Sequence, residues 1–128
     1  MTENVTTIAL SKHAAEIANQ MKDSGVFPDA LNAAKFGMSY AIKYFWDDIG
    51  TSDKLIAFDK VYDSKGNNYN VGSIDSDKYI ENLMLSLYPN CESPYKFARI
   101  LMCYGLNQLG DYLDNGTLFP INKFMWGN

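Results

Sequence analysis

The sequence has few of the residues that build reactive or metal-binding sites. Its 128 residues contain two cysteines and one histidine, and the spacing of Cys91 and Cys103 fits no zinc-binding pattern. No apolar run reaches the roughly 18 to 20 residues that a membrane-spanning helix needs. The first residues have no basic segment or cleavage site of a secretory signal. We therefore expect a cytoplasmic protein with reduced thiols, no metal and no cofactor.

Arginine is nearly absent, and positive charge is scarce throughout. Arg99 is the only arginine among 11 basic residues, which face 15 acidic residues for a net charge of −4. Residues 1–54 carry five basic and seven acidic side chains, and residues 55–128 carry six and eight, so neither half is a basic tail. Affinity for nucleic acid depends on cations that displace counterions from phosphates. Tight DNA binding by a single copy is therefore not expected.

What the chain does have is apolar patterning. It is 47% hydrophobic, enough to bury one core. Residues 4–10 are rich in β-branched types and predict a short strand. Ser11 can cap a first helix of about 12 residues, which Gly25 ends. After Pro28, the spacing predicts a second helix over about 29–46. The small residues of that helix allow a neighbouring helix to approach closely: Ala30, Ala33, Ala34, Gly37 and Ala41.

The second half predicts two more helices after an ambiguous stretch. Residues 47–53 are polar and suggest an internal boundary, and residues 55–74 fit a strand and hairpin, one more helical turn, or an exposed loop. Asp75 or Ser76 can cap a third helix that Pro89 ends. The pair Ser93-Pro94 opens a fourth helix, which Asn115-Gly116 closes. The tail that follows is too apolar to remain without contacts.

The strand, helix, tight turn and helix over residues 4–46 resemble the ribbon-helix-helix fold. In that fold two chains pair their N-terminal strands antiparallel and interlock four helices. The resemblance implies a homodimer with residues 5–10 as the ribbon and residues 25–29 as the turn. The alternative is a single chain whose strand pairs with residues 55–71. The expected dimerisation residues are Thr6, Ile8, Leu10, Gly37 and Ala41.

The chain departs from the DNA-binding members of that family. Its ribbon offers only Asn4, Thr6 and Thr7 as polar groups, and Asp29 lies where a DNA phosphate would meet the second helix. A DNA-binding transcriptional regulator is therefore kept only as the alternative. Its phosphate contacts would come from Lys12, Lys22, Lys35 and Lys43.

Together these patterns predict a mainly α fold. A ribbon-helix-helix-like module (1–50) would be joined by a connector (51–74) to a C-terminal helical hairpin with an apolar tail (75–128). The pattern also resembles, more loosely, the small subunit of bacterial DNA phosphorothioation complexes, an oligomerising partner of larger enzymes. We therefore expect a non-catalytic adaptor subunit of a larger prokaryotic-type complex that binds itself and a larger protein, and the sequence leaves open a link of that complex to DNA.

The candidate partner-binding residues are aromatic or cationic, because such side chains dominate protein interfaces. They are Tyr95 and Arg99 beside the loop between the last two helices, and Phe124 and Trp126 in the tail. His13, in the first turn of a helix, is interpreted as a surface residue. A weaker hypothesis is an enzyme that holds a metal through Asp75 and Asp77.

Overall fold

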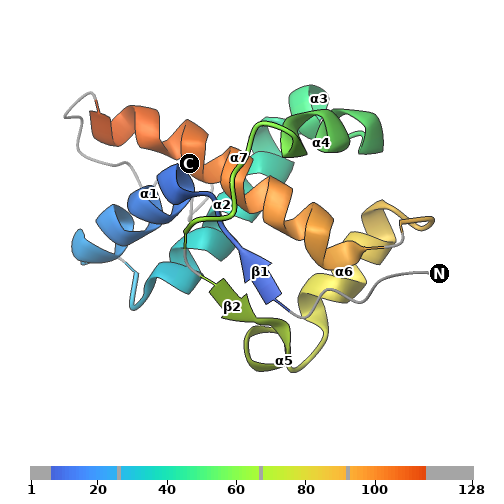
Figure 1. The fold of residues 1–128 in the computed structure, drawn as a ribbon, viewed down its shortest axis with the longest axis horizontal. Helices are drawn as coiled ribbons and strands as arrows, with labels where there is room; N and C mark the ends of the chain where they lie inside the picture. The colour runs from blue at the N-terminus through green and yellow to red at the C-terminus, as the bar shows by residue number, and fades with distance from the viewer. Residues whose placement is uncertain (1–6, 26, 67, 92, 115–128) are drawn as a thin grey trace.

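The computed structural model describes residues 7–25, 27–66, 68–91 and 93–114. For residues 112–114 it describes the backbone alone. Figure 1 shows how its helices and strands are arranged. Their bounds are β1 Thr7–Ala9, α1 Lys12–Asp23, α2 Ala30–Tyr44, α3 Trp46–Ile49, α4 Ser52–Asp59, β2 Asn68–Asn70, α5 Val71–Ile74, α6 Tyr79–Leu87 and α7 Pro94–Asp114. The predicted mainly α fold with a short N-terminal strand is confirmed.

The first two long helices begin with side-chain caps, of which Ser11 was predicted and Asp29 was not. The Ser11 hydroxyl accepts a hydrogen bond from the backbone N–H of Ala14 at 3.1 Å, and the Asp29 carboxylate accepts one from Asn32 at 2.8 Å. These bonds satisfy N–H groups that the first turn of a helix leaves without a partner. Gly25 follows α1 with a φ of 88°, a left-handed conformation that suits glycine after a helix end.

The helices α2 and α7 cross at the centre of the molecule (Figure 1). They meet at two glycines. A Cβ on Gly105 would collide with the carbonyl oxygen of Gly37, and a Cβ on Gly37 would lie 3.0 Å from Cγ of Leu106. The missing side chains let the two backbones approach closely. The small residues of α2 therefore accommodate α7, a helix of the same chain.

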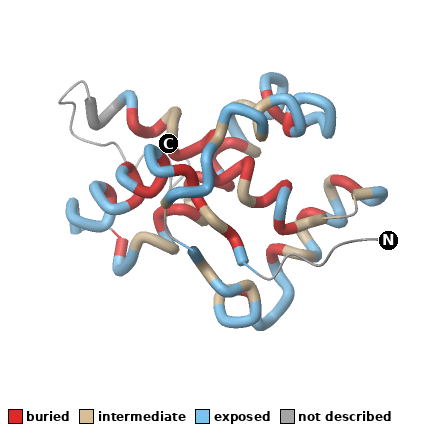
Figure 2. The backbone as a smooth tube through the Cα atoms, viewed as in Figure 1, coloured by how far each residue is buried: buried red, intermediate tan, exposed pale blue. Residues whose placement is uncertain are grey.

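One hydrophobic core receives side chains from all the long helices. Figure 2 shows buried residues concentrated along α2 and α7 and on the inward side of α1. The first four helices come from the N-terminal half of the sequence, and α7 comes from its end. Residues of the expected N-terminal module and of the expected C-terminal hairpin thus contribute to the same core.

The strand β1 pairs with β2 of the same chain. The pairing is antiparallel, with Ile8 opposite Tyr69. The side chains of Ile8 and Leu10 are 1% and 0% exposed, so they lie in the core of a single copy. This is the intrachain pairing that the sequence left open beside a ribbon shared by two copies. The resemblance to the ribbon-helix-helix fold stays a prediction.

Helices occupy more of residues 47–74 than the sequence indicates. The polar stretch expected as a boundary contains α3 and the first residues of α4. Of the interpretations open for residues 55–74, the helical one is observed over residues 55–59, where Leu55 is fully buried and α4 packs on α7. Residues 68–70 do form a strand, but it pairs with β1 and not with a strand from the preceding stretch.

The start of α6 depends on a carboxylate four residues before Tyr79, its first residue. Asp75 is 1% exposed and accepts hydrogen bonds from the backbone N–H groups of Ile80 at 2.8 Å and Glu81 at 3.1 Å. Lys78, between Asp75 and Ile80 in the sequence, has a φ of 62°, in the left-handed region. Asp75, one of the two predicted capping residues, therefore binds N–H groups of the first turn, although the helix begins only at Tyr79 and its N-cap position is Lys78.

Candidate functional site

Arg99, predicted to bind a partner, makes its contacts within the chain. Its side chain is 11% exposed. Nε donates to the carbonyl oxygen of Ala9 at 2.6 Å, and Nη1 donates to Oδ1 of Asp59 at 2.7 Å. Nη2 donates to the carbonyl oxygen of Asp63 and to the Ser64 hydroxyl. Arg99 thus ties β1, α4 and the following loop to α7, and its guanidinium donors serve the fold.

Tyr95, the second predicted partner-binding residue, is also interior. It is 6% exposed, and its hydroxyl donates to Oδ2 of Asp75 at 2.6 Å. Burial and the hydrogen bond to that carboxylate raise the pKa of the Tyr95 phenol, so it remains a donor at neutral pH. Because the same carboxylate also caps α6, Tyr95 connects α7 to the start of α6.

The carboxylates of Asp75 and Asp77, hypothesised as metal ligands, already accept hydrogen bonds from other groups of the chain. Both oxygens of Asp75 already accept hydrogen bonds, and Oδ1 of Asp77 accepts one from the backbone N–H of Tyr79 at 3.1 Å. Within the described ranges, no group of three or more histidine, cysteine or acidic side chains lies close enough to hold a metal ion. His13 is exposed on α1.

The other predicted residues are distributed over the fold. Ile8, Leu10, Gly37 and Ala41 are buried within one copy, so these expected dimerisation residues offer no exposed side chain to a second copy. The lysines of the DNA-binding alternative divide between α1 and α2. Lys35 Nζ donates to the carbonyl oxygen of Ile74 at 3.3 Å, and Lys43 Nζ lies 5.2 Å from the centre of the Tyr44 ring. Lys12 and Lys22 are exposed. Thr6, Phe124 and Trp126 lie outside the described residues.

Asp63 gives a prediction for the pH dependence of stability. Its Oδ1 accepts hydrogen bonds from the backbone N–H groups of Lys65 and Lys12, both at 2.9 Å, and these bonds lower the pKa of its carboxyl group below 3.8. A lowered folded-state pKa means that the carboxylate stabilises the fold above its unfolded pKa. That stabilisation is lost as the pH falls through the folded-state value.

We therefore expect Asp63→Asn to be less stable than the wild type near neutral pH, and the difference to shrink as the pH falls below about 4. Urea unfolding of both proteins across the acid range, followed by circular dichroism, measures this. A difference between the two proteins that stays constant over that range would contradict the role given to this carboxylate.

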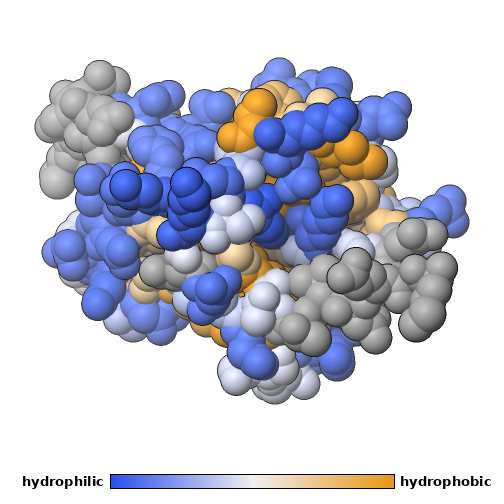
Figure 3. Space-filling view, in the orientation of Figure 1, coloured by the Kyte–Doolittle hydropathy of each residue, from blue (hydrophilic) through white to orange (hydrophobic). Residues whose placement is uncertain are grey.

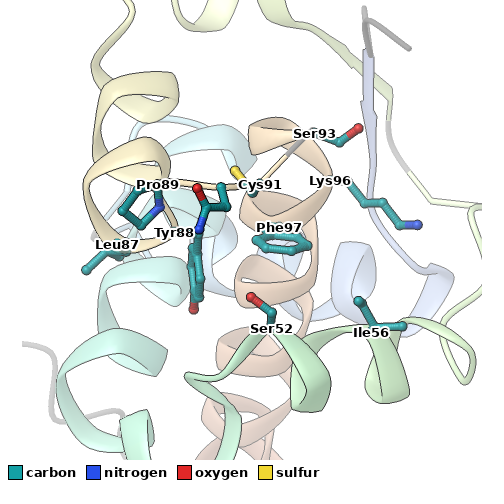
Figure 4. Close-up of a pocket in the computed structure, with 10 residues that line it drawn as sticks. Ser52, Ile56, Leu87, Tyr88, Pro89, Cys91, Ser93, Lys96 and Phe97 are labelled. Carbon is teal, nitrogen blue, oxygen red and sulfur yellow. The ribbon is translucent and has the colours of Figure 1, made fainter. Parts of the chain in front are cut away.

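A groove of about 500 Å³ lies between α4, the end of α6 and the start of α7 (Figure 4). In Figure 4, the rings of Tyr88 and Phe97 lie between α6 and α7, and Ile56 approaches from α4. The side chain of Lys96 points away from these rings, toward β1. The full lining is Ser52, Ile56, Leu87, Tyr88, Pro89, Asn90, Cys91, Ser93, Lys96 and Phe97.

The aromatic wall of this groove is held in place by specific contacts. The Tyr88 hydroxyl donates to the carbonyl oxygen of Gly50 at 2.7 Å, and burial raises the pKa of Tyr88 to about 12. The Tyr88 ring meets that of Phe97 edge-on at 4.9 Å between centroids, and that of Trp46 at 6.0 Å. Rings fixed in this way need little reordering when a ligand binds.

The polar groups of the groove come from Ser52, Asn90, Ser93 and Lys96. Burial raises the pKa of the Cys91 thiol, so it is protonated at neutral pH and acts as a small apolar side chain. Among the described residues that line the groove, only Lys96 is charged. Such a surface suits an apolar side chain, with one cation at its side.

Apolar side chains are exposed in and next to the groove. Ile56 in the groove wall is 46% exposed, and Trp46, whose ring lies against Tyr88, is 37% exposed. Figure 3 shows hydrophobic residues in orange gathered at the α3–α4 end of the visible face, whereas most of that face is hydrophilic. Apolar surface that is gathered in one place and next to a hollow is typical of an interaction site.

Sequence reasoning missed the groove residues but came close to them. The loop after α6, with its prolines and tyrosines, was identified as a place for partner contacts. The structure turns Tyr95 inward and leaves Tyr88 in the groove wall. Ile56 was missed, because the stretch that contains it gave no clear periodicity.

Comparison with protein-family models, with curated proteins and with solved structures finds no match to this chain. Over the residues that the structure covers, no helix has both the length and the apolar character of a transmembrane span.

Proposed function

We propose that this chain is a non-catalytic adaptor subunit that binds another protein through the groove between α4, α6 and α7. The observation that carries the proposal is the groove itself, in which Ile56, Tyr88 and Phe97 surround a space of about 500 Å³. That volume lies within the range in which proteins bind small ligands and anchoring side chains of partners. Its lining is mainly apolar, and its two buried rings are fixed by packing.

A protein ligand fits this groove better than a polar metabolite does. A polar molecule needs several converging donors and acceptors to replace its hydration. The walls expose more apolar than polar surface, with hydrocarbon from Ile56, Leu87 and Pro89 and one charged group, Lys96, among the described lining residues. An apolar side chain of a partner, inserted at the centre and surrounded by contacts that exclude water, matches the anatomy of a protein interface.

The proposal is tested by selecting peptides from a random dodecapeptide display library on the immobilised wild-type chain. We expect enrichment of peptides with bulky apolar residues, because burial of such a residue in the groove provides most of the binding energy. The substitution Ile56→Asp places a carboxylate in the apolar wall of the groove. This variant is expected to bind the enriched peptides at least about tenfold more weakly.

Val61→Asp is the matched control. Both positions are exposed, and Val61 is outside the groove lining, so both variants should keep the wild-type unfolding midpoint. Val61→Asp should also keep the wild-type affinity. The proposal is overturned if the wild type enriches no peptide, or if Ile56→Asp binds the enriched peptides as well as the wild type does.

A further inference from the structure

We infer that the partner segment carries an acidic residue close to its apolar anchor, and that this acidic residue pairs with Lys96. The inference rests on the proposed function, since it specifies the chemistry of the ligand for the same groove. It starts from the position of Lys96, whose side chain in Figure 4 extends from the groove toward the neighbouring strand.

Lys96 stands between two adjacent hollows. It lines the apolar groove together with Phe97, and it also lines a second hollow of about 240 Å³ beside β1. Three charged residues, Asp59, Lys96 and Arg99, line the second hollow, whereas Lys96 is the only charged residue in the described lining of the first. The lining of the second hollow is Thr7, Ala9, Asp59, Ser64, Tyr95, Lys96 and Arg99. A segment that leaves the apolar groove on this side therefore passes the ammonium group of Lys96.

The positive charge of Lys96 is only weakly compensated within the chain. Its Nζ lies 3.7 Å from Oδ2 of Asp59, and its side chain is 48% exposed, the geometry of a weak, solvent-screened pair. The same carboxylate makes the much closer contact of 2.7 Å to Arg99, whose side chain is 11% exposed. Asp59 is thus neutralised chiefly by Arg99. The three charges sum to +1.

A local positive charge stands out on this protein, whose net charge is −4. At a partly exposed position beside an apolar site, one cation adds little affinity by itself, but it selects partners of opposite charge and disfavours those of like charge. Lys96 and Phe97 are neighbours on α7. The partner's acidic residue is therefore expected within about three residues of its apolar anchor, given about 3.3 Å per extended residue.

The same peptide selection tests this inference separately from the proposed function. Enriched peptides should contain Asp or Glu within three residues of the bulky apolar position. Lys96→Glu should bind them about fivefold more weakly than the wild type, and a peptide with Lys in place of the acidic residue should reverse that order. The control Lys22→Glu makes the same charge change on α1, away from both hollows, and should bind like the wild type.

The possible outcomes separate the two proposals. Apolar peptides without acidic residues, bound equally by the wild type and Lys96→Glu, would overturn the inference and leave the adaptor function standing. Equal weakening by Lys96→Glu and Lys22→Glu would also overturn it, since that result reflects net charge alone. If no peptide is enriched, both proposals fail together.

Discussion

Gly105→Ala is expected to lower the free energy of unfolding by about 3 to 5 kcal/mol, one of the two largest effects we expect from a single substitution in this chain. The added methyl group would collide with the backbone carbonyl of Gly37, which cannot turn aside as a flexible side chain can. The helices α2 and α7 would have to separate along the centre of the core. Urea unfolding followed by circular dichroism measures the change.

Gly110→Ala is the matched control on the same helix. Its added methyl group would lie 2.5 Å from Cδ1 of Ile17, the far end of a side chain that can change rotamer. Both substitutions also gain about 1 kcal/mol of helix propensity. We expect Gly110→Ala to stay within about 1 kcal/mol of the wild type. Equal effects at the two positions would show that α2 and α7 do not meet at Gly105.

Arg99→Ala is expected to destabilise the fold by about 3 kcal/mol. The substitution removes the donors for the carbonyl oxygens of Ala9 and Asp63 and leaves the Asp59 carboxylate without its close partner. Arg99→Lys should recover less than half of the loss, because an ammonium group cannot reproduce the planar donor fork that reaches three elements at once. Chemical unfolding of each variant gives these values.

Lys96→Ala tests whether the stability lost in Arg99→Ala comes from the specific contacts of Arg99 or from the loss of a positive charge. Lys96 contacts the same carboxylate, but at 3.7 Å and with a side chain that is 48% exposed, so its loss should cost less than about 0.5 kcal/mol. If Arg99→Ala were as mild as Lys96→Ala, Arg99 would not hold β1 and α4 on α7.

The helix boundaries were the most predictable part of the fold, because they are set by local chemistry. Ser11 and Ser93-Pro94 mark helix starts and Gly25 marks an end through local backbone chemistry, and all three were predicted. No tertiary information is needed for such signals. Residues 55–59 lacked them, and their place in α4 goes with the burial of Leu55 in the core.

The roles of individual side chains were predicted less well, because exposure depends on which elements meet. Tyr95 and Arg99 are residue types that favour interfaces, and they stand next to a loop. The structure turns both inward, where Asp75 and Asp59 accept their hydrogen bonds from positions 20 and 40 residues away along the chain. Amino-acid composition does not predict contacts between residues so far apart in the sequence.

The groove was beyond sequence reasoning for the same reason. Ile56, Tyr88 and Phe97 come from three separate segments, and none of them belongs to a motif. Their proximity results from the packing of α4 and α6 against α7. Apolar side chains that the core does not bury are found exposed at Trp46 and Ile56.

The most direct test of the docking site is a methyl-resolved NMR titration of the isoleucine- and leucine-labelled wild-type chain with the most strongly enriched peptide. Binding in the groove predicts shifts of the Ile56 and Leu87 methyl signals, with the Ile17 and Ile42 signals of α1 and α2 unchanged. Shifts at Ile17 or Ile42 with none at Ile56 would place the binding surface elsewhere and contradict the account.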